Sequence, residues 1–315
     1  MTSSARMFVS FALTATLSVT LASCGDELAV ASEIRGFRVF GARIENLSRS
    51  STMRAAEAAP GERVRVTLAY TDPIAMTRPI TFVWVFCPQT ARMGNALGCA
   101  PTSAVPLMGS SVEYEIPRNI EYSVDPTGRA RIQGVMLACA GGTLGFNPTT
   151  MLPTCTGSGA ESVTMIRSIR VRTTETDAIN RNPELRAVAL HIAGRPSDEF
   201  VTLDAATPVR VPRCASDPCP EHTFEARVTD ESRETYGTLD NTGAPIMQPE
   251  RLQFGFFSTG GKMDLSFRVD TAERPMGPIR NTWTAPTTPG THVLFVSAQD
   301  VRGGFDWLER RVIVE

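Results

Sequence analysis

The fold class of this chain is decided by two neighbouring stretches, RVRVTLAYT at residues 63–71 and TFVWVFC at residues 81–87. In the first, valine and leucine alternate with arginine and threonine, the period-2 pattern of a strand with one buried face. The second is apolar on both faces and carries Trp84, so we expect it to lie in the middle of a sheet. The sequence therefore predicts a β-sheet with a buried tryptophan near its centre.

Short strand-like segments separated by turn residues recur along the rest of the chain, and no convincing helical period follows residue 24. This pattern predicts an all-β protein. The first segment, residues 34–45, contains Gly36 and Gly41 and is expected to be a bent edge strand. The further predicted strands are residues 112–116, 130–139, 161–174, 185–192, 223–229, 252–256, 263–269, 291–300 and 305–315, of which the last two form the clearest hairpin.

A polar run at residues 175–183 divides the strands into two groups of similar order. We therefore predict two tandem immunoglobulin-like β-sandwich domains, residues 34–174 and 184–315, joined by residues 175–183 as a linker. Trp84 matches the buried tryptophan of that fold. Three stretches between strands are expected to be long loops, residues 88–110, 140–160 and 231–250.

The first 24 residues have the pattern of a signal peptide. Arg6 precedes an apolar run at residues 7–21, which is shorter than the roughly 20 residues of a membrane-spanning helix. The run ends in Leu21-Ala22-Ser23-Cys24, which resembles the lipobox of bacterial lipoproteins. The resemblance implies that Cys24 receives a diacylglycerol, that residues 1–23 are removed, and that residues 24–33 form a lipidated tether. The alternative is an ordinary secretory signal with a coincidental cysteine.

Cys24 is one of seven cysteines, so its lipidation leaves an even number. Outside the cytoplasm, an even number of cysteines indicates disulfides. Spacing favours local pairs, although other connectivities stay open. A metal site is weakly supported, because the chain lacks a C-x-x-C motif and has no histidine beside any pair. The favoured pairs are Cys87–Cys99, Cys139–Cys155 and Cys214–Cys219.

A bridge from Cys87 to Cys139 is not expected. Each of these cysteines lies at the exit of a predicted strand. If the two strands are antiparallel neighbours, their exits lie at opposite ends of the sheet, too far apart for a disulfide. This argument also favours the local pairs.

Several turn and strand motifs resemble those of one group of proteins. The chain is similar to lipoproteins of high-GC Gram-negative bacteria that carry immunoglobulin-like modules behind a lipobox. This resemblance implies a fold and a location, and it implies no activity. The motifs that carry it are Ala59-Pro60-Gly61-Glu62, Trp84 with Cys87-Pro88, residues 281–286, Pro289-Gly290 and Asp300-Val301-Arg302-Gly303-Gly304.

The sequence offers few candidates for chemistry. His191, His222 and His292 do not form a metal-binding motif, and no G-x-S-x-G nucleophile motif occurs. The net charge of −2 gives no basic footprint for nucleic acid. The run Phe254, Phe256 and Phe257 could form a sugar-binding face, but Phe257 should point opposite to the other two, which favours core packing.

Asp300 is the one weak candidate for a calcium ligand, and no other cofactor is indicated. Calcium takes six to eight oxygen ligands, and the chain has no dense acidic run to supply them. Asp followed by Gly-Gly is also what a hairpin turn requires. We favour the turn. The other isolated carboxylates considered are Asp72, Asp230 and Asp306.

These observations predict a non-enzymatic, lipid-anchored protein of the cell envelope that serves in binding, adhesion or envelope organisation. Its expected partners are the membrane, through the N-terminal lipid, and an envelope protein or glycan. Gly25 stands where enteric sorting uses aspartate to retain lipoproteins at the inner membrane, so we expect the outer membrane, on either face. The alternative is a secreted-type hydrolase with its site in the three long loops.

Overall fold

The structure is a computed structural model. Residues Ser32–Glu315 form one compact unit. The predicted signal peptide, the lipobox residues and Cys24 lie outside the described residues. The structure describes residues 31–73, 78–88, 106–119, 122, 124, 129–147, 153–173, 178–270 and 277–315.

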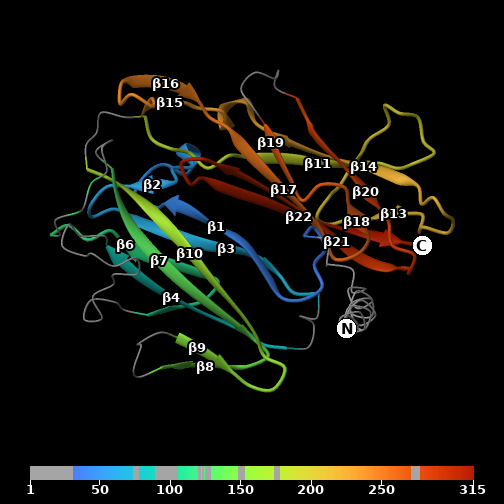
Figure 1. Cartoon of the computed structure of the whole chain (residues 1–315), viewed down its shortest axis with the longest axis horizontal. Helices are drawn as coiled ribbons and strands as arrows, with labels where there is room; N and C mark the ends of the chain where they lie inside the picture. The colour runs from blue at the N-terminus through green and yellow to red at the C-terminus, as the bar shows by residue number, and fades with distance from the viewer. Residues whose placement is uncertain are drawn as a thin grey trace, which may run out of the picture. The chain divides into compact units, whose positions relative to one another are not determined.

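The described residues form an all-β structure, as predicted (Figure 1). Apart from the strands, the regular elements in these ranges are two single 3₁₀ turns, Ser51–Met53 and Asp230–Ser232. Among these residues, no helix has both the length and the apolar character needed to cross a membrane. We call residues 34–173 the first half and residues 184–315 the second half.

The first half contains two main sheets that enclose one apolar core. The smaller sheet has the order β1 (Arg38–Asn46), β3 (Arg63–Thr71) and β6 (Ser111–Glu115). The larger sheet has the order β2 (Glu57–Ala58), β10 (Glu161–Arg172), β7 (Arg129–Ala140), β4 (Ile80–Pro88) and β5 (Leu107–Met108).

The stretches that decided the fold class lie where the sequence placed them. In β3, Val64, Val66 and Leu68 are buried in the core. In β4, Trp84 is fully buried, and the strand lies between β7 and β5. The predicted edge strand is β1, whose register shifts between Val39 and Gly41. This bulge is the expected bend.

The second half also has two main sheets around one core. One has the order β12 (Val201–Thr202), β11 (Leu185–His191), β14 (Glu221–Val228), β20 (Ile279–Thr284) and β18 (Lys262–Met263). The other has the order β13 (Val209–Val211), β22 (Phe305–Val314), β21 (Gly290–Asp300), β17 (Leu252–Ser258) and β19 (Phe267–Asp270). The predicted closing hairpin is β21–β22, which pairs from Gly290 with Val314 to Gln299 with Phe305.

Two stretches that the sequence marked as loops contain hairpins. Residues 140–160 hold β8 (Thr143–Phe146) and β9 (Pro153–Thr156), and residues 231–250 hold β15 (Thr235–Leu239) and β16 (Pro245–Pro249). The turn of the second hairpin is fixed by Asp240, whose carboxylate accepts bonds from the backbone of Thr242 and Ala244 at 2.8 and 2.9 Å. Asp at the start of a turn makes such bonds readily, so this turn closes the hairpin.

The described part of the predicted linker, residues 178–183, is packed into the structure. Asn180 and Asn182 are buried, and Arg181 forms an antiparallel bridge with Ala55. At the other end of the first half, Ser32 and Glu33, which the sequence placed in the tether, pair with Ser258 of β17. The compact unit therefore begins at Ser32, with the chain held against the second half.

Candidate functional site

Two of the three predicted disulfides are present. Cys139 bonds to Cys155, with the Cα atoms 5.4 Å apart, and Cys214 bonds to Cys219, with the Cα atoms 5.0 Å apart. The first ties the β8–β9 hairpin to the end of β7. The third predicted pair includes Cys99, which lies outside the described residues, so the Cys87–Cys99 pairing stays a prediction.

The register of β4 and β7 confirms the argument against a bridge between Cys87 and Cys139. The two strands are antiparallel, and they place Thr81 opposite Cys139 and Cys87 opposite Gln133. The two cysteines therefore lie at opposite ends of this strand pair.

Asp300 has the geometry of a turn residue. Its Oδ1 accepts bonds from the backbone N–H groups of Arg302 and Gly304, both at 2.7 Å. Gly303 between them has a φ of 100°, which favours glycine. In the part of the chain that the structure describes, no group of three His, Cys, Asp or Glu side chains is placed to hold a metal ion. The carboxylate shapes the β21–β22 turn.

His222 is a packing residue. It is fully buried beside Trp283, with ring centroids 5.6 Å apart, and its Nδ1 accepts a bond from the backbone N–H of Ala193 at 3.1 Å. Burial, and then the nearby His191, lower the pKa of His222 to about 4. The ring is therefore neutral in the folded protein near pH 7.

Outside the two cores, a further group of interacting side chains among the described residues forms the junction between the halves. Its apolar part consists of Ile34, Phe40, Ala69, Phe257, Phe295, Phe305 and Trp307. Phe40 of β1 stacks on Phe295 with ring centroids 3.9 Å apart and lies 4.7 Å from the ring of Phe257. A side chain at Gly41 would collide with the ring of Phe305. The glycine at the bulge of β1 therefore permits this close approach.

The aromatic run of β17 divides between core and junction. Phe254 and Phe256 belong to the core of the second half, whereas Phe257 belongs to the junction. This confirms that Phe257 points opposite to the other two. It also shows that the outer face of this sheet is buried against β1 at Phe257.

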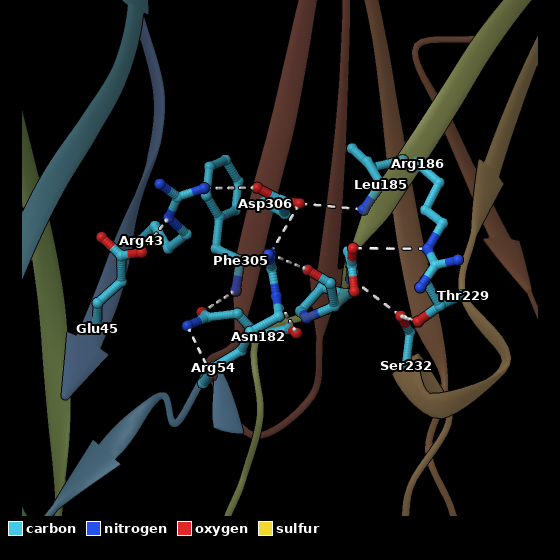
Figure 2. A network of polar contacts seen from close by, with 12 residues as sticks. Arg43, Glu45, Arg54, Asn182, Leu185, Arg186, Thr229, Ser232, Phe305 and Asp306 are labelled. Carbon is cyan, nitrogen blue, oxygen red and sulfur yellow. Dashed lines mark hydrogen bonds and ion pairs between the residues drawn. The ribbon is translucent and has the colours of Figure 1, made fainter. Parts of the chain in front are cut away.

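Asp306 is the centre of a polar network at the junction (Figure 2). One carboxylate oxygen accepts a bond from Arg43 at 2.9 Å. The other accepts bonds from Arg54 and from the backbone N–H of Leu185, both at 3.0 Å. Arg43 and Arg54 come from the first half, and Asp306 from the second. This carboxylate therefore pairs with two cations across the junction.

Asn182 joins the same segments through its amide (Figure 2). Its side-chain nitrogen donates to the carbonyl oxygens of Ile44 and Arg54 at 2.6 and 3.1 Å. Its side-chain oxygen accepts the backbone N–H of Phe305 at 2.9 Å. One buried amide of the linker thus bonds to both halves and fixes the path of the chain between them.

A second polar cluster surrounds Arg302 in the β21–β22 turn. Its guanidinium makes a two-point contact with the Glu250 carboxylate at 2.9 and 3.0 Å and also bonds to Glu234. It lies over the ring of Tyr236, 4.8 Å from the centroid. Burial raises the pKa of Glu250 to about 7 against the opposing effect of Arg302, and burial also raises the pKa of Asp300.

The first half reaches this turn through Arg167 of β10, which donates to the carbonyl oxygen of Gly303. Burial lowers the pKa of Arg167 to about 10. The turn that the sequence marked as a possible calcium site is therefore a contact between the halves. These side chains bind one half to the other and orient them; they are not arranged as a nucleophile with its base.

Sequence reasoning did not find the junction residues. Asp306 was only a minor calcium candidate, and Asn182 was taken as the end of a linker. The available signals were the Asn-Pro that ends the polar run and the carboxylate of Asp306 between two aromatic residues, Phe305 and Trp307. Neither signal identifies partners such as Arg43, which is more than 200 positions away.

Comparison with known proteins gives no family for this chain. No family model and no curated protein match it. Among solved structures, it is similar to dimeric latent PorU from Porphyromonas gingivalis, with 9% sequence identity and a TM-score of 0.19. The match covers 89% of this chain and 34% of that chain, so this chain spans about a third of its length. A similarity of this size carries no argument about fold or activity.

Proposed function

We propose that this protein is a lipid-anchored, non-enzymatic component of the cell envelope. In this proposal, two immunoglobulin-like β-sandwiches form one rigid binding module behind a lipid on Cys24. The observation that carries the proposal is the pair of disulfides, Cys139–Cys155 and Cys214–Cys219. Disulfides of this kind form in oxidising compartments such as the periplasm or the cell surface, where the signal-like first 24 residues would deliver the chain.

The immunoglobulin-like part of the proposal is supported by the arrangement of each half. In both, two sheets enclose a single core that contains a fully buried tryptophan, Trp84 or Trp283. Both features are typical of immunoglobulin-like sandwiches. The domain division that we propose is residues 34–174 and 184–315.

The binding role is supported by the junction. Its aromatic contacts and its charge pairs hold two sandwiches in one orientation, which favours a preformed surface spanning both. The partner that we propose is an envelope protein or a glycan at the outer membrane. The described residues give no observation that favours the hydrolase alternative, and two of its three candidate loops contain hairpins.

Replacement of Cys24 tests the anchor. We expect the Cys24→Ser chain to leave the membrane fraction or to retain its signal peptide, because a protein held by acyl chains loses its stable attachment without them. Fractionation and the mass of the intact protein measure both outcomes. The matched control is the double change Cys214→Ser and Cys219→Ser, which removes a disulfide and should leave the protein in the membrane. A Cys24→Ser chain that fractionates and weighs like wild type, apart from the substitution, would contradict the proposal.

A further inference from the structure

Strand β19 exposes a row of apolar side chains at the edge of its sheet. Phe267 and Val269 are 50% and 57% exposed, and Leu265, just before the strand, is 41% exposed. We call these three residues the β19 edge. Single exposed apolar residues are common, but a contiguous exposed group often marks an interaction surface.

The β19 edge continues the face of the sheet that forms the junction. Phe267 pairs with Gly255 and Val269 with Gln253, so both share a face with Phe257. The ring of Phe267 packs edge-on against that of Phe257, with centroids 5.9 Å apart. The apolar surface that β1 covers at Phe257 therefore extends to Phe267, where side chains face solvent.

The compact unit begins beside this edge. The carbonyl oxygen of Ser32 accepts the backbone N–H of Ser258 at 2.9 Å, and its hydroxyl lies 3.4 Å from the carbonyl oxygen of Met263. On the same side of β17, the backbone N–H of Phe256 donates to Ser266 at 3.0 Å. Gly255, the partner of Phe267, lies three positions before Ser258 in β17, a distance of about 10 Å in a strand.

This position limits how far the β19 edge can lie from an anchoring lipid. Cys24 and Ser32 are eight residues apart, which gives a reach of at most about 28 Å for a fully extended chain. A lipid on Cys24 therefore limits the distance of the β19 edge from the membrane surface to about 40 Å. Near that edge, Lys262 and Asp264 are both exposed and balance each other in charge. Arg38 lies on the same face, with its guanidinium 4.6 Å from the ring centroid of Phe257. The surface offered to the lipid is thus apolar, with one arginine beside it.

We propose that the β19 edge rests on the bilayer as a second membrane contact, with Phe267 at the boundary between the headgroups and the acyl chains. This inference rests on the proposed lipidation of Cys24 and adds the orientation of the protein on the membrane. The occupant is a phospholipid surface that needs no anionic headgroup. The contact orients the sandwiches by fixing one edge of the second half against the lipid.

Quenching of a tryptophan by brominated acyl chains tests the contact. The full mature, lipidated chain carrying Phe267→Trp is placed in phosphatidylcholine vesicles with or without bromine on the acyl chains. The tryptophan fluorescence of the wild-type chain, measured in the same vesicles, is subtracted. We expect bromine to remove about half of the emission, since apolar side chains at this boundary lie roughly 5–10 Å into the membrane. Val269→Trp provides a second probe should the first variant fail to fold.

The matched control is Met247→Trp. Met247 is also apolar and is 68% exposed, but it lies on the β15–β16 hairpin, which joins β17 at its Leu252 end, away from Ser258. Its emission should be unchanged by bromine. Equal quenching of both variants, or quenching of neither, in a chain whose mass shows lipid on Cys24 would overturn the inference and leave the proposed function intact.

Two further outcomes would overturn it in distinguishable ways. A chain whose mass shows no lipid on Cys24 would refute the proposed function and remove the basis of the inference with it. Pairing of two β19 edges from different copies would give a dimer by sedimentation, with emission from Phe267→Trp insensitive to bromine. That result would assign the edge to self-association instead of lipid.

Discussion

The two halves each bury one tryptophan completely, but the hydrogen bonding of the indole N–H differs between them. In the second half, Nε1 of Trp283 donates to the carbonyl oxygen of Gly260 at 3.0 Å, and the ring lies beside His222. In the first half, Trp84 is stacked on Phe86, and Nε1 of Trp84 has no partner among the described residues. The same sequence feature therefore supports an apolar core in one half and a partly polar core in the other.

The halves also differ in the sign of the charge that they bring to the junction. The first half contributes the arginines Arg43, Arg54 and Arg167, whereas the second half contributes the buried carboxylates of Asp300 and Asp306. Apolar contacts alone tolerate small rotations, but hydrogen-bonded charge pairs specify one orientation. This comparison indicates that the apolar part of the junction stabilises it and that the charged side chains fix the orientation of the two halves.

The largest expected effect comes from removing the shared acceptor at the junction. Asp306→Ala leaves Arg43, Arg54 and the N–H of Leu185 without this partner, and breaking a buried pair in this way costs about 3 kcal/mol or more. We expect denaturant unfolding, followed by circular dichroism and tryptophan fluorescence, to show that loss and to separate into two transitions. Glu315→Gln is the control, because its pair with Arg210 is exposed and should contribute less than about 1 kcal/mol. Similar curves for the two variants would show that the charges do not couple the halves.

The next effect concerns the buried histidine of the second core. The pKa of His222 is about 4 in the folded protein, below the ordinary value of 6.5. The unfolded chain therefore binds more protons between these values, and the protein loses stability as the pH falls from 6.5 towards 4, by about 3 kcal/mol in total. We expect His222→Gln to remove this loss, measured as the unfolding free energy at several pH values.

Comparing His222→Gln with wild type separates the contribution of His222 to the pH dependence of stability from that of Glu250. The pKa of Glu250 is raised to about 7 from 4.5, so its contribution falls as the pH rises through that range, opposite in sign to that of His222. Glu250 is present in both chains and cancels in the difference. His191→Gln serves as the control and should keep most of the pH dependence, because burial is the larger cause of the shift at His222. A pH profile of His222→Gln that matches wild type would refute the assignment.

The smallest effect distinguishes the two tryptophans. Trp84→Phe and Trp283→Phe remove the same volume from a fully buried site, but only Trp283→Phe also removes a hydrogen bond, worth about 1 kcal/mol. Trp283→Phe should therefore destabilise the protein more by about that amount, in denaturant unfolding of each variant. Equal losses would indicate that the two indole groups have equivalent surroundings, contrary to the structure.

The sequence predicted what depends on local pattern and little of what depends on distant pairing. Alternation in residues 63–71 identified β3, and short spacings identified the two disulfides, because each signal lies within a few residues of its cause. The β15–β16 hairpin was missed because Gly237, Pro245 and Pro249 weaken a strand pattern, while tertiary context decides whether such segments pair. The contact of Arg43 with Asp306 joins positions 263 residues apart, and no single-sequence pattern connects them.

The pairing of Ser32 and Ile34 with Ser258 has a mechanical consequence. These hydrogen bonds attach the start of the compact unit to β17, in the second half, before the chain reaches β1 in the first. In an anchored chain, tension on the tether would reach the C-terminal sheet directly. The first half would bear this force only after these hydrogen bonds broke. A pull on the anchor would therefore be resisted first by the second half, which is synthesised last.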